Sequence, residues 1–133
     1  MKTVLANGCF DLFHYGHLAH LRAARKLGDR LIVALTRDRF VKKGVGRPVF
    51  VEYQRAAILR SLRDVDEVFL TANTMEALES IRPDIFVKGS EYRGNIEPEH
   101  QAFCDAHGIE IAFTDELTYS STELLRYYES RRG

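Results

Sequence analysis

A short apolar run that passes through a turn into a helical pattern constrains this chain more than any other feature. Residues 2–6 (KTVLA) have the length and composition of a buried strand, and Asn7-Gly8 marks its end. After His14-Tyr15-Gly16-His17, apolar residues recur at near-helical spacing up to the stop signal Gly28-Asp29: Leu18, Leu21, Ala24 and Leu27. The stretch from Ala6 to Arg30 therefore predicts a strand, a turn that carries two imidazoles, and a helix.

The start of this helix is suited to binding phosphate. Its first turn leaves backbone N–H groups unpaired at the positive end of the helix dipole, where an anion can bind. His14 and His17 can donate hydrogen bonds that strengthen as charge builds in a transition state, and Gly16 allows a close approach to the backbone. Each histidine alone is better explained as an ordinary polar residue at a helix start, because helix starts are usually polar. Their combination with the other small and polar residues of this turn favours the phosphate site.

The length and charge of the chain limit its partners. We expect 133 residues to form one domain, spanning residues 1–133. Lys plus Arg and Asp plus Glu number 19 each, so no net charge attracts nucleic acid or an acidic membrane. No apolar run approaches the length of a membrane span, and the N-terminus lacks the pattern of a signal peptide. We therefore expect a cytoplasmic protein with free thiols at Cys9 and Cys104.

Two groups of histidine and cysteine residues raise the question of a metal site. The group at the first turn lacks the paired-ligand spacing of structural zinc: Cys9, His14 and His17. The second group lies on one face of the helix predicted at residues 97–107: His100, Cys104 and His107. Phe103 and Cys104 are equally well explained as core contacts of that helix. We therefore predict no metal site built from protein side chains.

Apolar runs of strand length alternate with helical patterns along the rest of the chain. Strands are predicted at residues 30–36, 65–70, 84–88 and 109–114. Helices are predicted at residues 51–62, 75–81 and 97–107 and from Glu123 onward, and the face of the first carries Tyr53, Ala57, Ile58 and Leu62. This alternation predicts an α/β, doubly wound (Rossmann-like) parallel sheet of about five strands. Such sheets bind ligands at the carboxyl ends of their strands, where the histidine turn lies.

Three other stretches carry groups that suit a nucleotide. A basic loop that can close over an anion contains Lys42, Lys43, Gly44, Gly46 and Arg47. The stretch after residues 84–88 offers the backbone at Gly89, the carboxylate of Glu91 and the ring of Tyr92 to a base. Hydroxyl groups precede the last helix and can hold phosphate oxygens: Ser120, Ser121 and Thr122. An exposed loop, a glycine turn and a helix cap explain the same residues without a ligand.

The run GCFDLFHYGH at residues 8–17 resembles the H-x-G-H signature of the cytidylyltransferase-like nucleotidyltransferases. This family contains glycerol-3-phosphate cytidylyltransferase and the heptose 1-phosphate adenylyltransferases. The resemblance continues through KLGDRLIVAL, RPVFVEYQR, VDEVF, DIFVKGSEY and YSSTELL, and so covers nearly the whole chain. It implies that a phosphomonoester attacks the α-phosphorus of a nucleoside triphosphate and that pyrophosphate is released.

The resemblance also implies roles for individual residues. Catalysis by charge stabilisation is expected from His14, His17 and Lys43, although the sequence does not distinguish Lys43 from Lys42. The residues expected to bind the nucleotide are Gly8, Cys9, Phe10, Asp11, Gly16, Lys42, Arg55, Lys88, Gly89, Glu91, Tyr92, Ser120, Ser121 and Thr122. For Arg55 the sequence alone favours an exposed helix arginine, and only the resemblance favours a phosphate contact. The relatives form homodimers, in which Asp66 would meet an arginine of the second subunit.

The base and the acceptor are less directly indicated. The cytidylyltransferases carry an R-T-x-G-I-S-T block, and residues 113–122 here lack its arginine and glycine. Residues 87–92 and Arg47-Pro48-Val49 are more similar to the heptose phosphate adenylyltransferases, so we favour ATP, a sugar or polyol phosphate, and Mg²⁺ bound with the triphosphate. The alternatives are a CTP-dependent enzyme acting on glycerol 3-phosphate or a similar phosphoalcohol, and a nucleotide-binding regulatory module without catalysis. A fragment of a class I aminoacyl-tRNA synthetase is disfavoured by the short chain and its net charge of zero.

Overall fold

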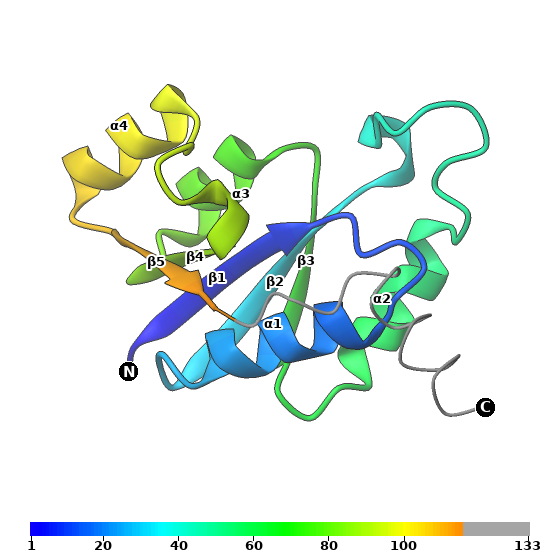
Figure 1. Cartoon of the computed structure of the whole chain (residues 1–133), viewed down its shortest axis with the longest axis horizontal. Coiled ribbons are helices and arrows are strands. Elements are labelled where there is room, and N and C mark those ends of the chain that lie inside the picture. The colour runs from blue at the N-terminus through cyan, green and yellow to red at the C-terminus, as the bar shows by residue number, and fades with distance from the viewer. Residues whose placement is uncertain (116–133) are drawn as a thin grey trace, which may run out of the picture.

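Five parallel strands form the central sheet in the order β3-β2-β1-β4-β5 (Figure 1). The strands are β1 (Thr3–Gly8), β2 (Arg30–Thr36), β3 (Glu67–Thr71), β4 (Ile85–Gly89) and β5 (Glu110–Thr114). This computed structural model describes residues 1–115, so the predicted Ser120, Ser121 and Thr122 and the helix from Glu123 lie outside the described residues. The predicted fold class, an α/β doubly wound parallel sheet of five strands, is confirmed.

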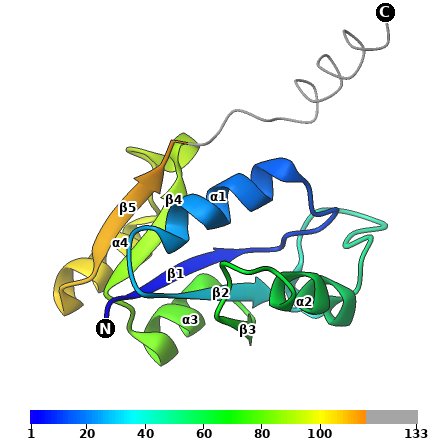
Figure 2. The ribbon, with the colours of Figure 1, turned by 90° about the horizontal axis from the view of Figure 1, so that it is seen from below.

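Four helices connect the strands and cover both faces of the sheet (Figure 2). They are α1 (Tyr15–Arg25), α2 (Glu52–Arg60), α3 (Thr74–Ile81) and α4 (Pro98–His107). Two short 3₁₀ helices follow strands: η1 (Asp38–Phe40) after β2 and η2 (Ser90–Tyr92) after β4. Within residues 1–115, no helix combines the length and apolar composition needed to cross a membrane.

Strand β1 ends later than predicted, at Gly8, and helix α1 ends earlier than predicted, at Arg25. Strand β1 continues past Ala6 because Asn7 and Gly8 pair with Ala34 and Leu35 of β2. Helix α1 ends at Arg25, before the predicted Leu27. The chain then passes so close to β1 that a Cβ on Gly28 would lie 2.7 Å from the Lys2 carbonyl oxygen. Gly28 is therefore needed for close approach as well as for ending the helix.

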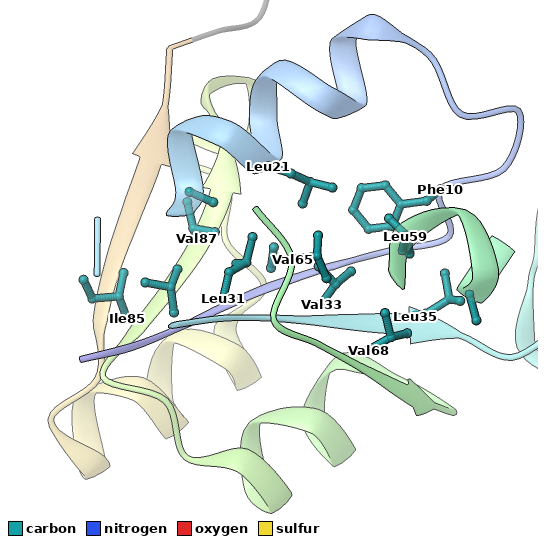
Figure 3. Close-up of a cluster of buried hydrophobic side chains, with 14 residues drawn as sticks. Phe10, Leu21, Leu31, Val33, Leu35, Leu59, Val65, Val68, Ile85 and Val87 are labelled. Atoms are coloured by element: carbon teal, nitrogen blue, oxygen red, sulfur yellow. The ribbon is translucent and has the colours of Figure 1, made fainter. Parts of the chain in front are cut away.

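Alternating side chains divide the strands between two cores. On β1, Val4 and Ala6 pack toward α1 and α2, whereas Leu5 packs toward α3 and α4. The first core includes Leu21 of α1 and Leu59 of α2 (Figure 3). The second includes side chains of α3 and α4: Ala77, Leu78 and Cys104. Each strand residue thus has its side of the sheet determined by its place in the period-two pattern.

The buried face of α2 is not the one that its apolar residues predict. Tyr53 is 80% exposed and Ala57 is also exposed, so this part of the predicted helical face is wrong. The buried side chains of α2 are Arg55, Ala56 and Leu59. The side chain of Arg55 points inward because its guanidinium finds hydrogen-bond acceptors at the ends of β1 and β2.

The strand order places a switch point between β1 and β4. From β1 the chain builds outward through β2 and β3, then returns to β4 on the other side of β1. The connections that leave β1 and β4 therefore diverge at the carboxyl edge of the sheet. In open α/β sheets this divergence forms the ligand-binding crevice.

Candidate active site

A pocket of about 480 Å³ lies at this switch point, at the carboxyl ends of β1, β4 and β5. The predicted site residues that line it are Gly8, Cys9, Phe10, His14, Gly16, His17, Lys43, Lys88, Gly89, Glu91 and Tyr92. Four lining residues were not predicted as site residues: Asn7, His20, Val87 and Thr114. Of the predicted residues within 1–115, three do not line it: Asp11, Lys42 and Arg55. The pocket thus joins the histidine turn to the stretch after β4.

The two histidines cap helix α1 reciprocally. His14 is the N-cap residue, and its Nδ1 accepts a hydrogen bond from the Gly16 N–H (3.0 Å). The Nδ1 of His17 accepts one from the His14 N–H (3.2 Å), and the two rings stack with centroids 3.9 Å apart. Because each Nδ1 accepts, these hydrogen bonds assign the proton of a neutral ring to Nε2. Each ring therefore keeps one N–H donor for a ligand.

His17 is held in its neutral form. Burial lowers its pKa from 6.5 to about 4, and the positive charges of His14, Lys43 and His20 act in the same direction. The rings of Phe10 and Phe13 contribute to that burial, with centroids 5.4 and 5.3 Å from the imidazole. At neutral pH His17 is a positioned, uncharged hydrogen-bond donor.

The basic loop brings one of its two lysines to the pocket. Lys43 lines the pocket and Lys42 does not, which distinguishes the two residues that the sequence left equivalent. Gly44 and Gly46 follow with positive φ angles of 97° and 80°, a backbone region that favours glycine. Val45 between them is fully exposed. The loop therefore reaches the pocket through Lys43 while its tip lies in solvent.

Asp11 holds this loop and does not face the pocket. Its buried carboxylate accepts hydrogen bonds from the Arg47 Nε (2.8 Å) and from the Val49 (2.7 Å) and Phe50 (2.9 Å) N–H groups. Burial alone would raise the pKa of Asp11, but these hydrogen bonds and the charge of Arg47 outweigh it and keep the pKa well below its usual range. The prediction that Asp11 contacts the nucleotide is corrected, because its oxygens are already bound within the protein.

Arg55 is likewise a structural residue. Its side chain is 1% exposed, and Nη1 donates to the carbonyl oxygens of Cys9 and Thr36, both at 2.8 Å. Nε donates to the Phe50 carbonyl (2.9 Å), and Nη2 pairs with Asp38 Oδ1 (2.7 Å). The predicted phosphate contact of Arg55 is therefore wrong. The guanidinium joins α2 to the carboxyl ends of β1 and β2.

At the end of β4, side chains fold toward the pocket. The Lys88 Nζ donates to Asn7 Oδ1 (3.2 Å) and lies 4.1 Å from the centre of the Tyr92 ring. The carboxylate of Glu91 lies over Gly89, where a Cβ would come within 2.5 Å of it. Because Gly89 has no side chain, the Glu91 carboxylate can lie against the backbone at this position.

His20 and Thr114 complete the pocket wall between α1 and β5. The Nδ1 of His20 and the Oγ1 of Thr114 form a hydrogen bond of 2.8 Å. Burial lowers the pKa of His20, Lys88 acts in the same direction, and Glu91 opposes them. The spacing of His14, His17 and His20 at intervals of three was a signal for this contact, because residues three apart share a helix face.

The metal alternatives find no support among residues 1–115. No group of three His, Cys, Asp or Glu side chains among these residues is arranged to hold a metal ion, and this includes the two groups that the sequence raised as alternatives. Cys104 is fully buried in the core, while His100 pairs with Glu97 and His107 contacts Arg82. Among the described lining residues Glu91 is the single carboxylate, so the described chain does not fit a dedicated magnesium cage.

Asp66 has partners within its own chain. Its Oδ2 accepts from the Leu31 N–H (2.8 Å) and pairs with the Arg25 Nε (3.2 Å). These contacts connect the start of β3 to β2 and α1. They give Asp66 a structural role within its own chain.

The sheet order, the switch-point pocket and the capped helix start define a Rossmann-like α/β domain suited to an anionic ligand. A family model described as cytidylyltransferase-like matches residues 5–125. The chain belongs to this family of nucleotidyltransferases, as the resemblance of residues 8–17 indicated.

Individual relatives agree with the family match. The chain is 37% identical to the bifunctional protein HldE of Desulfatibacillum aliphaticivorans over 136 residues, which cover 99% of this chain and 28% of that protein. HldE of Alkalilimnicola ehrlichii is 41% identical over 128 residues, which cover 93% of this chain and 27% of that protein. The chain therefore spans about a quarter of the length of these relatives.

Solved structures show the same fold. A lipopolysaccharide core biosynthesis protein from Thermoplasma volcanium GSS1 matches with a TM-score of 0.75 and 31% identity, covering 89% of this chain and 99% of that one. A protein of unknown function from Archaeoglobus fulgidus matches with a TM-score of 0.68, covering 90% and 93%. Its identity of 22% supports the fold alone.

Replacing Arg55 with Met should destabilise the fold. The change leaves three carbonyl groups without their donor, and breaking a buried charged network costs about 3–5 kcal/mol of unfolding free energy. Urea unfolding measures this loss, and Arg60→Met at the exposed end of α2 is the matched control. Unchanged stability of Arg55→Met would contradict the structural role.

His17 should titrate far below an ordinary histidine. The fold favours the neutral ring, so this contribution to stability is complete above pH 6.5 and is lost as the pH falls from 6.5 toward 4. NMR titration of the imidazole C–H signals measures the midpoint, and a His17→Gln variant identifies the signal. A midpoint near 6.5 would show that the ring is not buried as described.

Proposed function

We propose that this chain transfers adenosine monophosphate from ATP to the phosphate of a sugar or polyol phosphate and releases pyrophosphate. The observation that carries the proposal is the pair of Nε2–H donors on His14 and His17, beside Lys43 and the start of α1, in the switch-point pocket. This end of the pocket suits the triphosphate because it combines two imidazole donors, a helix N-terminus and the ammonium group of Lys43.

The reaction needs no covalent intermediate on the protein. An oxygen of the acceptor phosphate forms a bond to the α-phosphorus, the bond from that phosphorus to the bridging oxygen breaks, and its electron pair leaves with pyrophosphate. His14 and His17 donate hydrogen bonds to phosphate oxygens that gain negative charge, and Lys43 adds a positive charge. The protein's contribution is alignment and charge stabilisation.

The other end of the pocket suits the nucleoside. Tyr92 offers an aromatic face, while Glu91, the backbone at Gly89 and the His20–Thr114 pair offer polar groups to ribose and base. ATP is favoured over CTP because residues 87–92 are similar to the adenylyltransferases. The likeness to a lipopolysaccharide core biosynthesis protein supports a sugar phosphate as the acceptor.

Mg²⁺ would enter with the triphosphate. The described pocket offers one carboxylate, so phosphate oxygens of the nucleotide would supply most of its ligands. A homodimer is the expected assembly from the family resemblance, and sedimentation at several protein concentrations tests it.

Release of pyrophosphate tests the proposed reaction. The protein with ATP, Mg²⁺ and a panel of sugar and polyol phosphates should release pyrophosphate with at least one acceptor. His14→Ala and His17→Ala should each lower kcat by about a hundredfold or more, with a smaller change in ATP affinity. Tight ATP binding without turnover across the panel would instead favour the regulatory module.

ATP should raise the melting temperature more than CTP at equal concentration. A ligand that binds only the folded state stabilises it by RT ln(1 + [L]/Kd), so at equal concentration the nucleotide with the lower Kd gives the larger shift. A thermal melt with each nucleotide and Mg²⁺ measures the difference. A larger shift with CTP would reassign the chain to the cytidylyltransferases.

A further inference from the structure

His20 is the third imidazole on the pocket side of α1, and the transfer step described above gives it no role. It follows His14 and His17 at intervals of three, so all three lie along one face of the helix. Its ring is half-buried between α1 and the end of β5, and it lines the pocket. Burial lowers the pKa of His20, so the ring is uncharged at neutral pH. His20 is therefore a neutral polar group that a ligand in the pocket would meet.

The hydroxyl of Thr114 determines which nitrogen of His20 carries the proton. Thr114 is 4% exposed, and its Oγ1 lies 2.8 Å from the His20 Nδ1. Within residues 1–115 this is the one hydrogen bond of the Thr114 side chain, so the buried O–H has Nδ1 as its acceptor. Nδ1 then accepts, as it does in His14 and His17, and this assigns the proton of the neutral ring to Nε2. The pocket thus meets a fixed Nε2–H donor.

An acceptor lies at the same corner of the pocket. Thr114 pairs with Gly89 in the register of β5 and β4, and the Glu91 carboxylate lies over Gly89. The negative charge of Glu91 acts on the pKa of His20 in the direction opposite to burial, which shows that the two groups are near each other. Within residues 1–115, however, the His20 ring is hydrogen-bonded to Thr114 alone. A donor and an acceptor therefore border the same part of the pocket without bonding to each other.

A neighbouring donor and acceptor match one edge of an amino-substituted base. Adenine presents a ring nitrogen, N1, that accepts a hydrogen bond beside an exocyclic amino group that donates one. We propose that the Nε2–H of His20 donates to this ring nitrogen and that the Glu91 carboxylate accepts from the amino group. The identity of the ligand as a nucleotide rests on the proposed function. Cytosine carries the same order of groups, so this pair selects amino bases over keto bases and does not by itself separate ATP from CTP.

Thr114 makes this selection strict, because it prevents His20 from adapting to the wrong base. Hypoxanthine reverses both groups: its N1 carries a proton, and an oxygen replaces the amino group. It would place N1–H against the Nε2–H of His20 and its oxygen against the Glu91 carboxylate. His20 can accept from N1–H only if its own proton moves to Nδ1, and the O–H of Thr114 opposes that move. Polar groups left unpaired in this way reject a ligand strongly.

Calorimetric titration with ATP and with ITP, each with Mg²⁺ and without an acceptor, tests the assignment. The two nucleotides differ only at the base edge that His20 and Glu91 would contact. The wild-type protein should bind ATP about tenfold or more tightly than ITP. His20→Leu should lower the affinity for ATP by about fivefold or more and reduce the ratio of the two affinities. His20→Gln, whose side-chain amide can still donate a hydrogen bond, should lose less.

Thr114→Val separates the proposed role from a structural one, because it removes the hydroxyl and keeps the shape of the side chain. With the proton of His20 no longer fixed, Nε2 can accept from the N1–H of ITP. The ratio of ATP to ITP affinity should therefore fall by about fivefold or more, while Thr114→Ser keeps the hydroxyl and should keep the wild-type ratio. A purely structural Thr114 would weaken both nucleotides equally and leave the ratio unchanged.

His107→Leu is the matched control, because His107 is exposed at the end of α4 and lies outside the pocket. Equal affinity for ATP and ITP in the wild type, or a ratio that stays unchanged in both His20→Leu and Thr114→Val, would overturn the assignment. If ATP is preferred through His20 but no sugar or polyol phosphate is turned over, the base contact stands and the proposed function fails. If pyrophosphate is released equally well from ATP and ITP, the transfer reaction stands and the base contact is wrong.

Discussion

The burial of one guanidinium group sets the geometry on which the pocket depends. Arg55 carries its charge into the interior, where an unpaired charge would be very costly, and four acceptors surround it. One of them is the carbonyl of Cys9, in the turn that leads from β1 to α1. Asp11 is a second buried charge, of opposite sign, and its carboxylate accepts hydrogen bonds from the backbone N–H groups that precede α2. The turn and the basic loop are thereby fixed to the same two buried charges.

The period-two pattern of the strands then decides which groups can meet a ligand. Ala6 and Val87 point toward α1, so the next residues, Asn7 and Lys88, point toward the opposite face of the sheet. The histidines of α1 and the lysine of β4 consequently approach the carboxyl edge from opposite faces. A parallel sheet with a switch point is the arrangement that opens both faces toward one crevice.

Apolar runs in the sequence predicted the strands well, whereas the helical face of α2 and the roles of solitary polar residues were predicted less well. The strands lie within two residues of their predicted positions, because an apolar run reports burial on both faces. Arg55 and Asp11 were assigned to the ligand, since a sequence does not show whether a polar group faces a pocket or a buried carbonyl. Asn7 was read only as a turn residue, although its amide joins two elements that are distant in the chain. Contacts between such elements leave no local pattern.

The distribution of charge in the pocket is consistent with catalysis by preorganised donors. Two neighbouring charged imidazoles would repel each other, and the lowered pKa of His17 avoids this because that ring stays neutral. A neutral ring also loses less hydration on burial than a cation, yet its Nε2–H still strengthens its bond as an oxygen gains charge. Two lysines also line the pocket, Lys43 on a loop and Lys88 at a strand end. In the proposed reaction the histidines would therefore supply directed hydrogen bonds, and the lysines would supply positive charge for the phosphates.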